Sequence, residues 1–168
     1  MISETYKKRA HLLIKTAKKN GMITNYSDFC KTKLANDTQL NEEEISYYTN
    51  KNKYNKDYNI GDIVFVLNYV YKNGEKGANH FFVIIDEDQA IDFNYFGFLL
   101  SSNINKVKFP YNELIEKNLT NGLYKDSIVK CDDFIRLSSK DISFKIGNVS
   151  EEDLTRFLDT YEKYLANN

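Results

Sequence analysis

Hydrophobic residues recur at helical spacing in the first part of the chain. Gly21 stands where such a helix would end, after apolar residues that lie three or four positions apart, namely Tyr6, Ala10, Leu13 and Ala17. We expect a second short helix after Asn25, whose side chain can cap it. A third is expected after Asn41, which precedes three glutamates that suit the positive end of a helix. The first fifty residues therefore predict a helical segment.

From residue 60 onward the pattern changes to that of β-strands. The segment Ile60–Tyr71 opens with a Gly-Asp turn and continues in β-branched and aromatic residues. Several short runs with brief connections predict a small antiparallel barrel. The other expected strands are Asn79–Ile85, Phe93–Leu100, Lys106–Phe109, Ser127–Ile135 and Phe144–Val149.

The chain ends in a strongly amphipathic segment. Ser150 can cap a helix there, with Asp153 three residues later, and the helix would carry one apolar stripe made of Leu154, Phe157, Leu158, Tyr161 and Leu165. Between the helical segment and the strands, residues 51–59 are rich in Lys, Asn and Tyr and show no apolar period, which is typical of a linker or an exposed loop. We therefore expect an α+β protein, with a helical extension over residues 1–53 and a barrel domain with a C-terminal helix over residues 54–168.

Charge and cysteine content narrow the function classes. Lys and Arg number 23 against 24 Asp and Glu, so there is no global basic field and a nucleic-acid partner would need a local groove. Cys30 and Cys131 match no metal-ligand spacing, and we expect no metal site and two reduced, buried thiols. The charged N-terminus and the lack of a long apolar run predict a cytoplasmic protein without a signal peptide or membrane segment.

His80 is the residue with the clearest chemical potential. It is one of two histidines, and it stands where a Gly-containing loop enters an apolar strand. A neutral imidazole there can take or give a proton near pH 7. The alternative is a structural histidine satisfied by a neighbouring carbonyl.

Four segments of the strand region follow one another in a recognisable order. They are Gly61-Asp62-Ile63-Val64, the run from Glu75 through Gly77, Asn79 and His80 to Ile85, Leu99-Leu100-Ser101-Ser102, and Ser127–Arg136 followed by Phe144–Asp153 and the terminal helix. Together, from about Tyr58 to Leu165, they resemble the PemK/MazF family of bacterial type II toxins. The resemblance implies an SH3-like barrel of the MazF or CcdB type. It also implies a homodimer that cleaves single-stranded RNA and a cognate antitoxin that blocks it.

Two positions depart from the family pattern. The family's catalytic arginine falls on Asn79, and the proline after it falls on His80. An asparagine cannot supply a permanent positive charge to a phosphorane. A second family arginine falls on Ile135, and Arg136 lies one step later, where a strand points its side chain to the opposite face unless a bulge intervenes.

The residues that remain still permit metal-independent RNA cleavage without a cofactor. His80 would act as base or acid, while Ser101 and Asn79 would donate hydrogen bonds to the phosphate. The substrate-binding candidates are Ser102, Lys76 and Arg136. The products would be a 2′,3′-cyclic phosphate and a 5′-hydroxyl end. Ser101 and Ser102 also suit a turn, and Lys76 a solvated loop.

Two other hypotheses stay open on the sequence alone. The chain can be a noncatalytic barrel that binds a protein partner, as CcdB-type toxins do, and the loss of the family arginine favours this alternative. The N-terminal helices can also cover the groove in cis, in which case deleting residues 1–53 should increase activity. A scaffold role for these helices is the competing interpretation, because their apolar stripes must pack somewhere.

Overall fold

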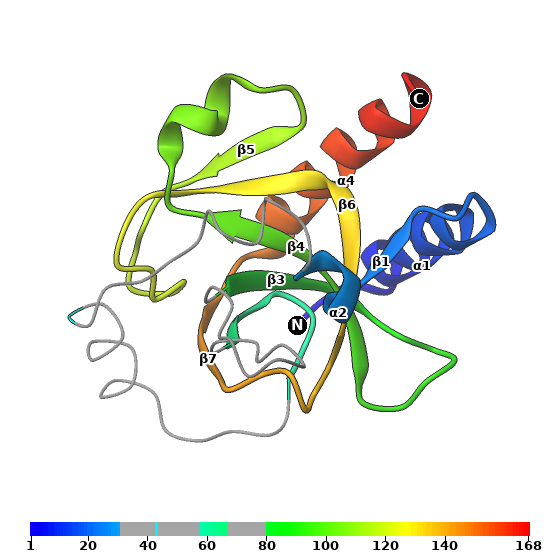
Figure 1. Ribbon diagram of the computed structural model, residues 1–168, viewed down its shortest axis with the longest axis horizontal. Coiled ribbons are helices and arrows are strands. Elements are labelled where there is room, and N and C mark those ends of the chain that lie inside the picture. Colours follow the sequence, from blue (N-terminus) through cyan, green and yellow to red (C-terminus); the bar gives the residue numbers. More distant parts are fainter. Residues whose placement is uncertain (31–42, 44–57, 67–79) are drawn as a thin grey trace.

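The first helix forms where the periodic pattern predicts it. The computed structural model describes residues 1–30, 43, 58–66 and 80–168 (Figure 1). Helix α1 spans Glu4–Lys19, and the Ser3 hydroxyl caps it by accepting a hydrogen bond from the Tyr6 amide at 3.2 Å. Strand β1 (Ile23–Asn25) and the single turn α2 (Tyr26–Phe29) follow. The expected cap by the Asn25 side chain is wrong, because that side chain makes no capping hydrogen bond.

The remaining strands and helices complete an α+β fold. They are β2 (Asp62–Val66), β3 (His80–Glu87), β4 (Asn94–Ser101), the 3₁₀ helix η2 (Ile104–Lys108), β5 (Asn112–Ile115), β6 (Ser127–Ser138), β7 (Phe144–Asn148) and α4 (Glu151–Ala166). The strands form one sheet in the order β1-β6-β4-β3-β2-β7, and β5 pairs with β6. No pairing among the described strands joins β1 to β7, so a closed SH3-like barrel stays a prediction.

Two elements differ from the sequence-based expectation. The expected strand Lys106–Phe109 is instead the 3₁₀ helix η2, and the strand β5 follows Pro110. The apolar residues that suggested a strand, Val107 and Phe109, are 46% and 52% exposed and join no core. The short strand β1 was not expected. It pairs in parallel with β6, from Ile23 opposite Phe134 to Asn25 opposite Arg136.

The sheet separates two hydrophobic clusters. Alternate residues of β3 face opposite ways, so Phe81, Val83 and Ile85 belong to the first cluster while Phe82 and Ile84 belong to the second. The first cluster lies under α1 and α4, and the second contacts α2. In Figure 1 α4 passes behind the sheet and α2 lies in front of it.

Helix α1 shares its core with the strands. Its buried residues Tyr6, Ala10, Ile14 and Ala17 are part of the first cluster. Arg9 ties it to α4 through Asp159 at 2.6 Å and Glu162 at 2.9 Å. The expected domain boundary at residues 53 and 54 lies outside the described residues and stays a prediction, as does the helix after Asn41.

The C-terminal helix confirms its predicted cap and stripe. The Ser150 hydroxyl accepts a hydrogen bond from the Asp153 amide at 3.1 Å, and Leu154, Phe157, Leu158 and Tyr161 are buried. Both cysteines are buried, reduced thiols. None of the helices in the described part of the chain has the length and apolar character that crossing a bilayer requires.

Candidate active site

His80 lies at the first position of β3, as the sequence predicts, but it is fully buried. Its exposed fraction is 0%. Two aromatic rings of α2 pack edge-on against the imidazole, Phe29 at 5.1 Å and Tyr26 at 5.9 Å between ring centroids. Phe82, two residues along the strand, lies 6.1 Å away. The histidine is therefore enclosed by aromatic side chains of the second cluster.

The imidazole carries no internal hydrogen bond that would explain its burial. Neither Nδ1 nor Nε2 has a hydrogen-bond partner within residues 1–30, 58–66 and 80–168. The structure thus does not show the neighbouring carbonyl that the structural alternative requires. Loss of hydration lowers the pKa of His80 to about 4, which keeps the ring neutral at pH 7. Because buried polar groups without partners are rare and costly, this ring is a candidate for function.

Ser101 lies beside His80 on the same face of the sheet. Phe81 pairs with Leu100 in the antiparallel ladder of β3 and β4, so the same register brings His80 opposite Ser101 at the next step. Side chains directly opposite one another share a face. The Ser101 hydroxyl accepts a hydrogen bond from the Asn103 amide at 3.2 Å, so it also serves the turn, and Ser102 is half-buried.

Lys130 brings a positive charge to this face, which the sequence analysis missed. It pairs with Leu99, two residues before Ser101, so its side chain lies on the face of Ser101 and His80. Its Nζ contacts the two carboxylate oxygens of Asp132 at 2.6 and 2.8 Å. The alternation within β6 was the available signal, since residues 130 and 132 must share a face opposite the buried Cys131.

The structure does not bring Arg136 to His80. Arg136 pairs with Phe96 of the first cluster and therefore lies on the other face of the sheet. Its guanidinium is 3.3 Å from Asp88 and lies 5.3 Å from the centre of the Phe96 ring. Ile135 is the residue that faces the second cluster. The other two expected site residues, Asn79 and Lys76, lie outside the described residues.

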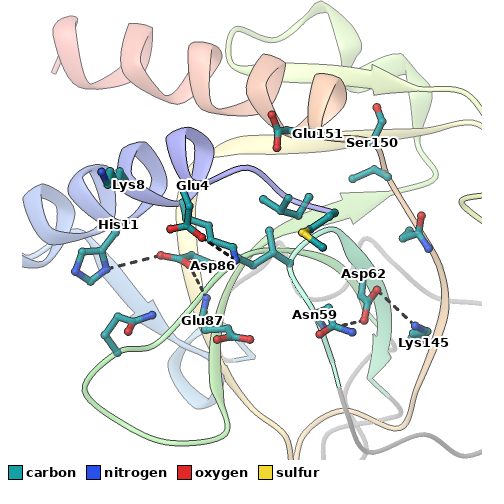
Figure 2. Close-up of a pocket in the computed structure, with 17 residues that line it drawn as sticks. Glu4, Lys8, His11, Asn59, Asp62, Asp86, Glu87, Lys145, Ser150 and Glu151 are labelled. Atoms are coloured by element: carbon teal, nitrogen blue, oxygen red, sulfur yellow. Dashed lines mark hydrogen bonds and ion pairs between the residues drawn. The ribbon is translucent and has the colours of Figure 1, made fainter.

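A separate polar cleft opens between α1, the start of β2, the end of β3 and the start of α4 (Figure 2). It encloses about 950 Å³. Asp62 contacts Lys145 at 3.6 Å and accepts a hydrogen bond from the Asn59 amide at 2.8 Å. Asp86 faces His11, with 3.9 Å between Oδ2 and Nδ1, and burial raises the pKa of Asp86 to about 6.

This cleft is poorly suited to RNA. Its carboxylates, which include Glu4, Glu87 and Glu151, outnumber its lysines, so it disfavours a phosphate backbone. Within the described residues, no three potential ligands are grouped so that they could hold a metal ion. The face with His80, Ser101 and Lys130 is thus the better candidate for RNA chemistry.

Comparison with known proteins settles the family. Residues 59–163 match the model described as PemK-like, MazF-like toxin of type II toxin-antitoxin system. The chain belongs to this family. PemK/MazF toxins are typically endoribonucleases, and membership suggests an antitoxin partner and an RNA substrate. The resemblance inferred from the sequence is therefore confirmed.

The other comparisons add little to this PemK/MazF assignment. The Mycobacterium tuberculosis toxin MazF-mt6 is similar in structure, with a TM-score of 0.48 and 12% identity over 62% of this chain and 96% of that chain. A search of curated proteins finds no match. The PemK/MazF match begins at residue 59, so α1, β1 and α2 all precede it. The two rings that cover His80 therefore come from outside the family region.

Proposed function

We propose that the protein is a toxin that cleaves single-stranded RNA without a metal ion. The observation that carries this proposal is the placement of His80 and Ser101 at the adjoining ends of β3 and β4, on one face of a PemK/MazF-family sheet. Lys130 adds a cation to that face from the neighbouring strand. Lys130 is level with Leu99 and Phe82, two residues along the strands from Ser101 and His80. With strands about 4.8 Å apart and about 3.3 Å per residue, the backbones of His80 and Lys130 are about 12 Å apart, and the lysine side chain shortens that span.

The reaction is a transfer of the phosphodiester within the RNA itself. The neutral His80 takes the proton of the ribose 2′-hydroxyl as the 2′-oxygen forms a bond to phosphorus. The bond from phosphorus to the 5′-oxygen breaks, and the leaving oxygen takes up a proton from water. The products are a 2′,3′-cyclic phosphate and a 5′-hydroxyl end. The need for a 2′-hydroxyl restricts the substrate to RNA.

The negative charge that develops on the phosphate must be stabilised by hydrogen-bond donors and a cation other than the missing family arginine. The Ser101 hydroxyl and the Asn79 amide donate hydrogen bonds to the nonbridging oxygens, and Ser102 and Lys76 contact the flanking phosphates. Lys130 supplies the positive charge when its Nζ moves from Asp132 to the phosphate. Arg136 is held by Asp88 on the other face and has no part in this proposal.

The family also suggests the partners of this activity. We propose that a cognate antitoxin binds the RNA face and blocks it, and that the active form is a homodimer in the cytoplasm. Size-exclusion chromatography with light scattering tests the dimer. A single species of monomer mass at micromolar concentration would remove that part of the proposal.

The direct test is an RNA cleavage assay in the presence of a chelator. Purified protein is incubated with mixed-sequence single-stranded RNA, and the new ends are analysed for cyclic phosphate. His80→Ala should abolish cleavage, whereas His11→Ala removes the only other histidine and should leave it unchanged. Circular dichroism confirms folding of both variants. Full activity of the folded His80→Ala protein would remove His80 from the mechanism.

A second candidate function is a noncatalytic toxin that binds a protein. The burial of His80 and the presence of Asn79 in place of the family arginine favour it. It differs from the first in a measurable way. Expression would be toxic without RNA cleavage, and toxicity would survive His80→Ala.

A further inference from the structure

We propose that α2 is an internal cover that occupies the RNA-binding position beside His80. The chain then cleaves RNA only slowly, in the small fraction of molecules in which α2 has moved away. This inference rests on the endoribonuclease function proposed above, and it concerns the regulation of the same site. It also explains why the candidate base is enclosed although both of its nitrogens lack hydrogen-bond partners among the described residues.

The rings of α2 occupy an aromatic surface on which a nucleobase could pack. Phe29 and Tyr26 pack edge-on against the His80 ring, and each of the two also lies 5.8 Å from Phe82. Aromatic surfaces of this type stack unpaired bases in single-stranded RNA complexes. The two aromatic side chains of α2 therefore compete with RNA for one surface.

A short strand holds the cover in place. Strand β1 pairs in parallel with β6 directly before α2, from Ile23 to Asn25. The Thr24 hydroxyl donates to the Asp133 carboxylate, at 3.0 and 3.1 Å from its two oxygens. Helix α2 itself is a single turn of four residues without a side-chain cap. In this proposal α2 leaves His80 while β1 stays paired.

The cover over His80 blocks access of RNA to the imidazole and also lowers the basicity of that ring. The enclosed ring has a pKa of about 4 because it is desolvated, which is too low for an efficient base near neutral pH. Water that reaches the ring after α2 moves would return its pKa toward the ordinary value of about 6.5. Opening therefore restores both the position for RNA and the proton affinity of the base.

The test measures exposure of His80 separately from RNA cleavage. Phe29→Ala removes the nearer ring, and Phe29→Leu is a milder version should the first variant fold poorly. Phe144→Ala is the matched control, because it removes a buried aromatic ring from the first cluster, on the other face of the sheet. With two histidines in the chain, NMR titration resolves the pKa of each ring.

The expected result is a rise in the His80 pKa by at least about one unit in the Phe29 variants, with RNA cleavage increased about tenfold, and neither change in Phe144→Ala. A His80 pKa that stays near 4 in folded Phe29 variants would overturn the cover. A raised pKa with no cleavage by any variant would leave the cover standing and contradict the endoribonuclease function instead. Cleavage by the unmodified protein that Phe29→Ala does not increase would also overturn the cover.

Discussion

At the scale of single residues, burial of the His80 ring lowers the stability of the fold. Two buried ring nitrogens without partners among the described residues cost about 1 to 3 kcal/mol relative to an apolar ring. We expect His80→Phe to raise the free energy of unfolding at pH 7 by about 1 to 2 kcal/mol while it abolishes RNA cleavage. Urea denaturation measures this change. A loss of stability would mean that the imidazole has a partner that phenylalanine cannot replace.

The depressed pKa of His80 also predicts how stability responds to acid. As pH falls below about 6.5, the unfolded chain binds a proton on this ring before the folded chain does. The free energy of unfolding therefore decreases between about pH 6.5 and pH 4. Relative to His80→Phe, the natural protein should lose about 2 kcal/mol between pH 7 and pH 5. Asp86 and Asp133, whose pKa values burial raises to about 6, act in the opposite direction.

Because those two carboxyl groups are present in both proteins, the comparison isolates the histidine. Urea denaturation of each protein at both pH values checks it. Parallel pH profiles for the two proteins would show that the imidazole is not desolvated in solution.

Lys130 is the residue on which the charge argument depends. We expect Lys130→Ala to slow RNA cleavage about 100-fold, the usual effect of removing one donor to a developing phosphate charge, and Lys130→Arg to retain most activity. Lys125 lies just before β6 and serves as the control, so Lys125→Ala should change the rate little. The cleavage rates are measured in a single-turnover assay. An unchanged rate in Lys130→Ala would mean that another residue supplies the positive charge at the phosphate.

At the scale of elements, α1 is part of the core. Tyr6, Ala10, Ile14 and Ala17 are buried against the sheet, so removing residues 1–20 exposes the first cluster. We expect this deletion to abolish cooperative thermal unfolding and to leave no RNA cleavage, contrary to the increase that a purely inhibitory extension would give. A folded, more active deletion protein would contradict this role of α1.

The elements also show what the sequence could predict. Helices α1 and α4 have unambiguous apolar periods, and β3 and β4 are long apolar runs, so all four were located correctly. The prediction of a strand was wrong at η2, where the alternating apolar residues Val107 and Phe109 are exposed. Strand β1 was missed because three residues are too few to show alternation, and its pairing with β6 depends on the tertiary structure.

The candidate site was predictable to a similar degree. Strict alternation along β6 would put Lys130 and Arg136, six residues apart, on the same face. They lie on opposite faces because the pairing of β4 with β6 is irregular between Gly97 and Leu99, and the sequence alone does not reveal that irregularity. The position of His80 at the strand end was predicted, but its enclosure was not. That enclosure comes from Tyr26 and Phe29, which no local pattern connects to residue 80.

At the scale of the whole molecule, a family fold carries an added N-terminal layer. Helix α1 completes one core, and β1 with α2 extends the sheet and covers its other face. We therefore expect a toxin-family protein whose proposed RNA face is present but covered in the isolated chain.

The most direct measurement is RNA cleavage, in chelator, by Phe29→Ala and by the double variant Phe29→Ala with His80→Ala. We expect the first to cut single-stranded RNA to cyclic-phosphate ends faster than the natural protein does, and the double variant not to cut it at all. Equal cleavage by the single and the double variant would contradict the central claim that His80 is the catalytic base.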